Sequence, residues 1–219
     1  MANKFMPINL SLKDRACLIV GGGNIAHRKI NTLLDYECKI TVVAAEPNDQ
    51  IKYFDQRGYV KLEIRKYKSP EASSYGVVIA ASDDMELNKQ VSEDCKKAGV
   101  PINVVDAPKL CDFTFPAVLK RDCLTVAVST DGKAPFLAGQ LRLILETVFP
   151  ERWKKIANIA ADYRKQVIRR WKDKPDQKVE CYDKFLNADW KTLLEEMNEQ
   201  EVQEEITKMI ELPEEPEKS

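Results

Sequence analysis

The chain has 219 residues, 44% of them hydrophobic, and a formal net charge of -1 at pH 7. This length and apolar content suit one ordinary domain plus a smaller one, with enough apolar residues for a sizeable core. The balanced charge excludes a general electrostatic attraction to nucleic acid, so an anionic ligand must be bound by local basic patches.

Strand and helix patterns alternate up to residue 105. Residues 16–20 form the first predicted strand, and apolar residues at helical spacing predict a helix over about 24–36. Asp83 or Asp84 caps a later helix that ends at Gly99. Further strands are predicted at 40–44, 60–65, 77–81 and 101–105. This order predicts an α/β fold with a Rossmann-like, doubly wound parallel sheet.

The pattern changes after Pro108. Two short strand patterns, 113–119 and 124–129, are separated by Lys120 to Asp122, and Pro135 suits the first turn of a helix that ends before Pro150. On that helix one side carries Leu137, Leu141, Leu145 and Val148. From residue 151 the spacing predicts helices, with candidate inward positions at Trp153, Ile156, Ile159, Ala160, Leu193, Leu194, Met197, Val202 and Ile206.

These patterns predict four regions: a Rossmann domain at 1–112, a small α+β module at 113–148, a helical C-terminal region at 149–212 and a disordered tail at 213–219. Residues 151–175 hold nine Lys and Arg against three Asp and Glu, whereas 176–219 hold five against fourteen. Two interpretations stay open for this asymmetry. The charges face water along helices, or the basic stretch helps to hold an acidic substrate.

The sequence also predicts where the protein works. It contains no apolar run of about eighteen residues, and Met1 to Pro7 lack the apolar core of a signal peptide. Its six cysteines are scattered without a C-x-x-C pair, which favours reduced thiols over a disulfide framework or a tight metal site. We therefore expect a cytoplasmic protein with no membrane and no nucleic-acid partner.

A glycine turn joins the first strand to the first helix, in Gly21-Gly22-Gly23-Asn24-Ile25-Ala26. Gly21 permits the tight turn, Gly23 lets the backbone approach phosphates, and Ala26 takes the helix-packing position of G-x-G-x-x-G/A. The N–H groups that open the helix favour negative charge. The turn predicts a dinucleotide site, although a lone match of this kind also fits a turn that binds nothing.

The second strand ends near a carboxylate that suits the adenine ribose. Glu46 lies 23 positions after Gly23, so its side chain or the neighbouring backbone at Ala45 is expected to meet the ribose hydroxyls. This favours NAD as the cofactor. Arg28 and Lys29 leave NADP open, since either is able to accept a 2′-phosphate.

Two further loops follow apolar strands, where ligands collect in open α/β sheets. Ser82 and Asp83 follow the strand at 77–81 and are expected to contact the cofactor. Asp106 follows the strand at 101–105, beside an Ala-Pro turn. A carboxylate there suits removal of a proton from a substrate that loses hydride, and an aspartate that simply forms a turn is the alternative.

Together these blocks resemble the precorrin-2 dehydrogenase family, also known as the siroheme synthase dehydrogenase/ferrochelatase module. The resemblance covers roughly residues 8–150, and the helical remainder is similar only in general type. The Asn-Val-Val-Asp-Ala-Pro and Ala-Val-Ser blocks are far more specific than the glycine turn. The blocks are Leu18 to Lys29, Ala80 to Asp84, Asn103 to Lys109, Phe115 to Ala117 and Val126 to Pro135.

The resemblance implies NAD-dependent oxidation of precorrin-2 to sirohydrochlorin in siroheme, and in some organisms cobalamin, biosynthesis. It implies that Asp106 removes protons and, in bifunctional members, serves insertion of Fe²⁺ as a transient metal contact, with no tightly bound metal. A dehydrogenase without chelatase activity is the alternative. Substrate contacts are expected from Lys109, Ser129, Thr130, Lys133 and Arg142, where Thr130 departs from the serine of some relatives.

Two more expectations follow. In the family, the segment after the nucleotide domain forms a homodimer, and residues 113–148 resemble that segment. We therefore expect a dimer with the active site near the subunit junction.

His27, the single histidine, replaces a glutamate common in the family and is interpreted as a helix-surface residue rather than a metal ligand. The alternative to an enzyme is a non-catalytic NAD(H)-sensing Rossmann protein, which has no need for Asp106.

Overall fold

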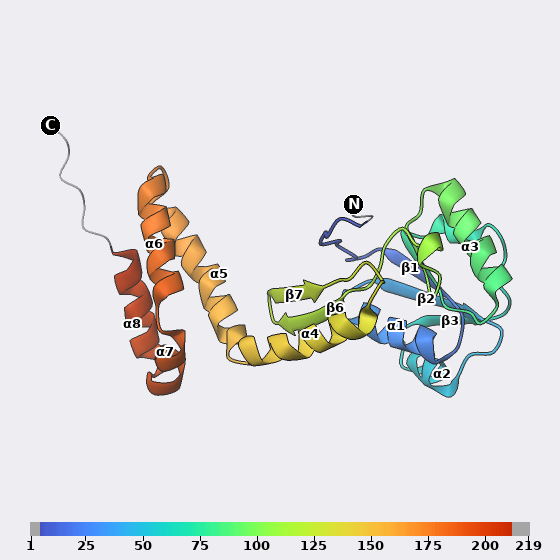
Figure 1. The fold of residues 1–219 in the computed structure, drawn as a ribbon, viewed down its shortest axis with the longest axis horizontal. Coiled ribbons are helices and arrows are strands. Elements are labelled where there is room, and N and C mark those ends of the chain that lie inside the picture. The colour runs from blue at the N-terminus through green and yellow to red at the C-terminus, as the bar shows by residue number, and fades with distance from the viewer. Residues whose placement is uncertain (1–4, 212–219) are drawn as a thin grey trace. The chain divides into compact units, whose positions relative to one another are not determined.

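The computed structural model describes residues 5–211 (Figure 1). The chain divides into two compact units. The first unit runs to Phe115 and also includes Asp131–Lys133; the second contains Pro116–Thr130 and the chain from Ala134 onwards. The first unit thus extends past residue 112, because Phe113 and Phe115 pack against its core. The expected tail at 213–219 lies outside the described residues.

The first unit is built on a five-stranded parallel sheet, as predicted. Its strand order is β3-β2-β1-β4-β5, so β1 lies at the centre, with Ile19 opposite Val42 on one side and Ile79 on the other. Its strands are β1 (Ala16–Val20), β2 (Lys39–Ala44), β3 (Lys61–Ile64), β4 (Val77–Ala80) and β5 (Ile102–Val104). This order confirms the Rossmann-like doubly wound fold.

Three helices cover the sheet, α1 (Asn24–Leu34), α2 (Asp49–Gln56) and α3 (Met85–Ala98), with short 3₁₀ turns η1 (Glu71–Ser74) and η2 (Pro108–Leu110). Helix α1 ends before the predicted Tyr36, and α2 is absent from the sequence prediction. Asp84, one of the two expected caps, accepts hydrogen bonds from the N–H groups of Glu86 and Leu87. Gly99 ends α3 with φ of 69°, a left-handed conformation that favours glycine.

Two apolar layers sandwich the sheet because alternate residues of each strand face opposite sides. Ile19 of β1 belongs to the layer that contains Ile30 of α1. Leu18, its neighbour, belongs to the layer that contains Val91 of α3. Both faces of the central strands are therefore buried. This packing holds in place the edge of the sheet at which the strands end.

The second unit begins with an antiparallel hairpin, β6 (Ala117–Arg121) and β7 (Leu124–Val128), against which α4 (Pro135–Val148) packs. The predicted spacer at Lys120 to Asp122 is wrong, because Lys120 pairs with Thr125 and Arg121 with Leu124. The turn is therefore shorter than the charged spacer that the sequence predicted. The chain turns at Asp122, whose φ is 56°.

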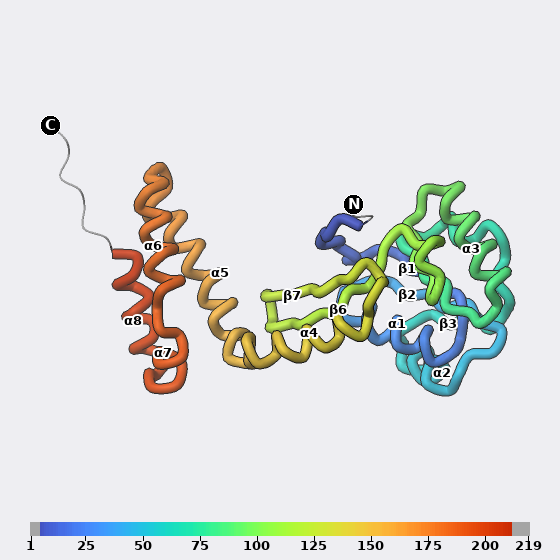
Figure 2. Tube along the Cα trace, viewed as in Figure 1, coloured from blue at the N-terminus to red at the C-terminus, as the bar shows by residue number. Residues whose placement is uncertain are grey.

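Four helices complete the second unit, α5 (Trp153–Arg170), α6 (Pro175–Asn187), α7 (Trp190–Glu196) and α8 (Glu199–Ile210) (Figure 2). Their core includes Tyr163, whose hydroxyl donates to the carbonyl of Cys181 at 2.7 Å. Met197 is the one expected inward residue that is exposed, at 37%, since it follows the last turn of α7 in extended conformation. Within 5–211 no helix combines the length and apolar content that a bilayer span requires.

Candidate functional site

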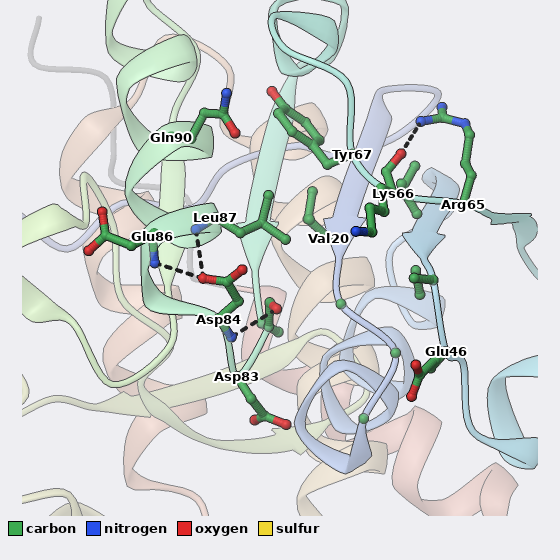
Figure 3. A pocket seen from close by; sticks show the side chains of 18 of the residues that line it. Val20, Glu46, Arg65, Lys66, Tyr67, Asp83, Asp84, Glu86, Leu87 and Gln90 are labelled. Atoms are coloured by element: carbon green, nitrogen blue, oxygen red, sulfur yellow. Dashed lines mark hydrogen bonds between the residues drawn. The ribbon is translucent and has the colours of Figure 1, made fainter.

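A cleft of about 840 Å³ opens where β1, β2 and β4 end (Figure 3). The segments after these strands form one side of it, and the first turns of α3 form another. The cofactor residues expected from the sequence that line the cleft are Gly21, Gly22, Gly23, Ala45, Glu46, Ser82 and Asp83. Asn24 and Ile25 are absent from this lining: the Asn24 side chain accepts a hydrogen bond from Asn48, and Ile25 packs against the core.

Crowding explains the first two glycines. Gly21 has φ of 129°, and a Cβ there would lie 2.2 Å from the carbonyl oxygen of Ala81. A Cβ on Gly22 would lie 2.7 Å from the carbonyl oxygen of Glu46. Real Cβ atoms do not approach backbone this closely, so both positions require glycine for the packing of β1 against its neighbours. Of these two glycines, the sequence motif predicted a role only for Gly21, in the turn.

Gly23 differs from the two glycines before it. Apart from Gly23 and its two chain neighbours, a Cβ at this position would meet no atom of the described residues within 4 Å, so the space in front of Gly23 is open. Gly23 is also the N-cap of α1, whose first turn contains no acidic residue. The N–H groups that open a helix lack intrahelical partners and attract anions. The cradle therefore fits a pyrophosphate that approaches the backbone at Gly23.

Glu46 and Asp83 lie on either side of the glycine turn (Figure 3), since β1 stands between β2 and β4 in the sheet. Both side chains are exposed. Arg28 and Lys29, the residues that left NADP open, do not line the cleft. Lys29 lies instead over the ring of Phe115, with Nζ 3.8 Å from the ring centroid.

The loop after β4 is held by a residue that the sequence did not single out. Asn88 of α3 is buried, and its side chain donates to the carbonyl of Ser82 at 2.8 Å and accepts from the Ser82 N–H at 3.3 Å. The Ser82 hydroxyl accepts from the N–H of Asp84 at 3.1 Å. These bonds fix the loop that presents Ser82 and Asp83 to the cleft.

The segment after β3 forms a further wall of the cleft, with Arg65, Lys66 and Tyr67, which no sequence motif predicted. Arg65 pairs with Glu63 and Glu71. Hydrogen bonds from Arg65 hold the pKa of Glu71 below its ordinary value. Burial raises the pKa of the Tyr67 hydroxyl, which donates to Asp94 at 2.8 Å. Only the folded structure shows that this segment lines the cleft, because no sequence motif links β3 to a ligand.

Asp106 forms a strained turn directly after β5. Its φ is 56°, a left-handed conformation that is uncommon outside glycine, and its side chain is exposed. The buried thiol of Cys111 accepts from the Val104 N–H at 3.2 Å and also reaches the carbonyl oxygens of Val104 and Ala107. Asn103 donates to the carbonyl of Phe113 at 3.0 Å. The turn is thus braced from both sides.

The remaining expected residues lie in different places. In the first unit Lys109 and Lys133 are exposed, and His27 is half-buried, with its ring centroid 5.1 Å from that of Phe54. In the second unit Ser129 is exposed, the Thr130 hydroxyl accepts from the N–H of Ala134 at 3.0 Å, and Arg142 pairs with Glu146. Within 5–211 no three His, Cys, Asp or Glu side chains gather as a metal site.

The sheet order and the glycine cradle define a dinucleotide-binding protein with a Rossmann-like fold. Residues 8–117, about half of the chain, match the family model described as "Putative NAD(P)-binding". The chain belongs to this NAD(P)-binding family. The cofactor expectation is therefore confirmed as NAD(P).

Similar proteins agree with the family resemblance. The chain is 43% identical over 163 residues to a siroheme synthase of Methylococcus capsulatus, a match that covers 74% of this chain and 34% of that protein. A siroheme synthase of Pseudomonas fluorescens is 42% identical over 164 residues, covering 75% and 35%. The chain thus spans about a third of these relatives' length.

One solved structure shares the fold over nearly the whole chain. The structure of SirC, a precorrin-2 dehydrogenase, superposes with a TM-score of 0.74 at 24% identity, covering 93% of this chain and all of that one. The helical C-terminal region belongs to this shared fold, which the resemblance over residues 8–150 left open.

Proposed function

We propose that the chain is an NAD⁺-dependent precorrin-2 dehydrogenase that forms sirohydrochlorin in siroheme biosynthesis. The observation that carries the proposal is the placement of a dinucleotide cradle and a braced carboxylate at the ends of strands in one sheet. The match to the NAD(P)-binding family covers both features, since it spans residues 8–117, and the similarity to siroheme synthases supports the activity. A non-catalytic sensor would need the cradle alone.

The residues divide the reaction between them. Gly23 and the start of α1 would hold the pyrophosphate of NAD⁺, and the bound cofactor would supply the hydride acceptor. Asp106 takes the proton that leaves with the hydride, so the substrate loses two electrons and two hydrogens. Because the Asp106 turn is braced, its carboxylate stays in place while the substrate binds and leaves.

The cleft favours NAD⁺ over NADP⁺. Glu46 suits hydrogen bonds to a ribose diol and repels a 2′-phosphate. Arg65, a cation of the wall after β3, is already paired with Glu63 and Glu71. We expect calorimetry to give tighter binding of NAD⁺ than of NADP⁺, and Glu46→Ser to narrow the difference. Equal affinities in the wild type would contradict the assignment.

The substrate is a polycarboxylate, and basic or hydroxyl side chains suit its carboxylates. Lys109 and Lys133 of the first unit are exposed cations, and Ser129, Thr130 and Arg142 of the second unit supply hydroxyls and a third cation. We assign these five residues to substrate binding. Individual replacement by alanine is expected to raise the KM for precorrin-2 and to leave the affinity for NAD⁺ unchanged.

We infer a homodimer from the exposed apolar side chains of α4. Its apolar side chains stay exposed within the chain, with Phe136 81%, Ile144 50% and Val148 55% accessible. A helix face of this kind normally marks a protein contact. Sedimentation is expected to give a dimer and Ile144→Glu a monomer. A wild-type protein that sediments at 25.0 kDa would contradict the assignment.

All six cysteines are free, which suits action in the reducing cytoplasm.

One experiment tests the activity. The protein is incubated without oxygen with precorrin-2 and NAD⁺, and sirohydrochlorin is followed by absorbance. The wild type is expected to produce it only with NAD⁺, and Asp106→Asn to bind NAD⁺ normally but to turn over slowly. Absence of NAD⁺-dependent oxidation would overturn the proposal. Fe²⁺ added afterwards, as a second substrate, decides between a bifunctional chelatase and a dehydrogenase alone.

A further inference from the structure

The cofactor cleft is rich in negative charge. The carboxylate side chains that line it are Glu46, Asp83, Asp84, Glu86 and Glu93. A pyrophosphate is itself an anion, and like charges in one cleft repel each other. The start of α1 offsets only part of this repulsion, because the N-terminus of a helix carries about half a positive charge. A free cation in the cleft would therefore complete the anion site.

The cleft is also lined by the cationic side chains of Arg65, Lys66 and Lys89. Arg65 is paired with two glutamates that do not line the cleft, and Lys89 is paired with Glu86 at 2.6 Å. Lys66 makes no ion pair with any carboxylate of residues 5–211. Of the three cations, Lys66 is therefore the one whose charge is available to a ligand.

The residues on either side of Lys66 hold its backbone in place. Arg65 donates a hydrogen bond to the Lys66 carbonyl at 3.1 Å. The hydroxyls of Tyr67 and Ser69 donate to the two carboxylate oxygens of Asp94, at 2.8 and 2.9 Å. Asp94 is a buried residue of α3, so these bonds join the segment after β3 to that helix. The Lys66 side chain stays exposed, and Figure 3 shows it turned towards the end of β1.

We propose that Lys66 is a further cofactor-binding residue, whose ammonium binds the pyrophosphate that approaches the backbone at Gly23. The inference rests on the proposed function, since it needs a dinucleotide in this cleft. Lys66 and Gly23 line the same cleft, and the flexible stem of a lysine carries its ammonium to a phosphate as a point charge. The phosphates are then held by two elements, the backbone N–H groups that open α1 and the ammonium from the segment after β3.

Binding measurements test the inference without turnover. Calorimetry is expected to show that Lys66→Met binds NAD⁺ about tenfold more weakly than the wild type, because a hydrogen bond between two charged groups is lost. Adenosine has no phosphate and is expected to bind both proteins equally. Lys66→Arg keeps the charge and is expected to retain most of the NAD⁺ affinity. A matching loss of adenosine affinity in Lys66→Met would overturn the contact with phosphate.

A matched control lies two residues further along the chain. Lys68 is exposed like Lys66 but does not line the cleft, so Lys68→Met removes the same charge from the same segment. Its affinity for NAD⁺ is expected to equal that of the wild type. Equal losses in the two variants would overturn the inference, because they would reflect the net charge of the segment. An unchanged NAD⁺ affinity in Lys66→Met would overturn it as well.

Titration with NADP⁺ identifies the phosphate that Lys66 binds. NADP⁺ has the same pyrophosphate and an additional 2′-phosphate, so a pyrophosphate contact predicts the same fold loss for both dinucleotides in Lys66→Met. A loss confined to NADP⁺ would overturn the inference, because Lys66 would then bind the 2′-phosphate. A loss of NAD⁺ affinity specific to Lys66→Met, in a protein that does not oxidise precorrin-2, would contradict the proposed function alone.

Discussion

Two turns at the same edge of the sheet obtain their shapes in opposite ways. The glycine turn after β1 and the Asp106 turn after β5 both need positive φ, 129° at Gly21 and 56° at Asp106. The glycine turn reaches positive φ without a side chain, at a place where neighbouring backbone is close. The Asp106 turn reaches positive φ with a residue that has a Cβ, although this conformation favours glycine.

The Asp106 turn compensates for that strain with side-chain hydrogen bonds from elsewhere. Cys111 bonds Val104 and Ala107, and Ser92 of α3 donates to the carbonyl of Leu110 at 3.3 Å. Strained residues persist only where the surroundings fix them, and they concentrate at functional sites. The glycine turn is therefore sensitive to changes at its own residues, and the Asp106 turn is sensitive to changes at its braces.

Gly21→Ala gives the largest expected effect on the glycine turn. Its Cβ would lie 2.2 Å from the Ala81 carbonyl oxygen, at a φ of 129° that L-residues rarely adopt. We expect a loss of about 3 kcal/mol or more in unfolding free energy, together with loss of NAD⁺ binding. Urea denaturation measures the first and calorimetry the second. A variant as stable as the wild type would contradict the crowding argument.

Gly23→Ala is the matched substitution two residues later. Apart from Gly23 and its two chain neighbours, no described atom lies within 4 Å of the added Cβ, so stability is expected to change by less than about 1 kcal/mol. The methyl group would occupy the space that we assign to the pyrophosphate, and NAD⁺ affinity is expected to fall about tenfold or more. Unchanged affinity would show that the phosphates do not approach Gly23.

The same contrast explains what the sequence predicted. The strands, the turn and the cofactor class follow from apolar runs and from glycines, which act where they stand. The role of Gly22 depends on the position of the Glu46 carbonyl. The bracing of Asp106 depends on Cys111 and Phe113, which fold back on β5. Hydrogen bonds of this kind follow no spacing rule, so Asp106 was predicted from the sequence without its supports.

The errors have a related cause. Helix α2 is short and mostly polar, and only Ile51 of its residues is buried, so its apolar spacing was too weak to predict it. Met197 fits the helical spacing of its neighbours, but α7 ends at Glu196 and turns the chain away. Lys120 and Arg121 look like a turn by charge, whereas cross-strand pairing extends the hairpin through both. In the hairpin, cross-strand pairing outweighed the local preference for a turn.

Cys111→Ala tests the braces of the Asp106 turn and is expected to have an intermediate effect. The substitution removes the acceptor for the Val104 N–H and a buried side chain, with an expected loss of about 1–3 kcal/mol in unfolding free energy. Turnover is expected to fall further than NAD⁺ affinity, because Asp106 loses its fixed position. Cys111→Ser keeps a donor and an acceptor and is expected to lose less.

The two cysteine variants also discriminate between bracing and packing. If the alanine and serine variants lose equal turnover, the hydrogen bonds of the thiol do not position Asp106. If neither variant changes stability or turnover, the Asp106 turn holds its conformation without Cys111, and the contrast with the glycine turn disappears.

The ion pairs after β3 give the smallest expected effect and extend the comparison to a third strand end. Arg65 holds the pKa of Glu71 below its ordinary value, so the folded state binds a proton less readily than the unfolded state. The ion pair therefore contributes to stability above the pKa of Glu71 in the unfolded state, and this contribution is lost as the pH falls through the pKa of the folded state.

We expect Arg65→Gln to lose less than about 1 kcal/mol in unfolding free energy at pH 7, and its difference from the wild type to shrink towards pH 3. Arg57→Gln, which removes an exposed arginine bonded to Tyr53, is the control, and its curve is expected to run parallel to the wild type. If the Arg65 curve is parallel as well, side-chain pairing does not stabilise this wall, and the segment after β3 is held by its backbone in the manner of the glycine turn.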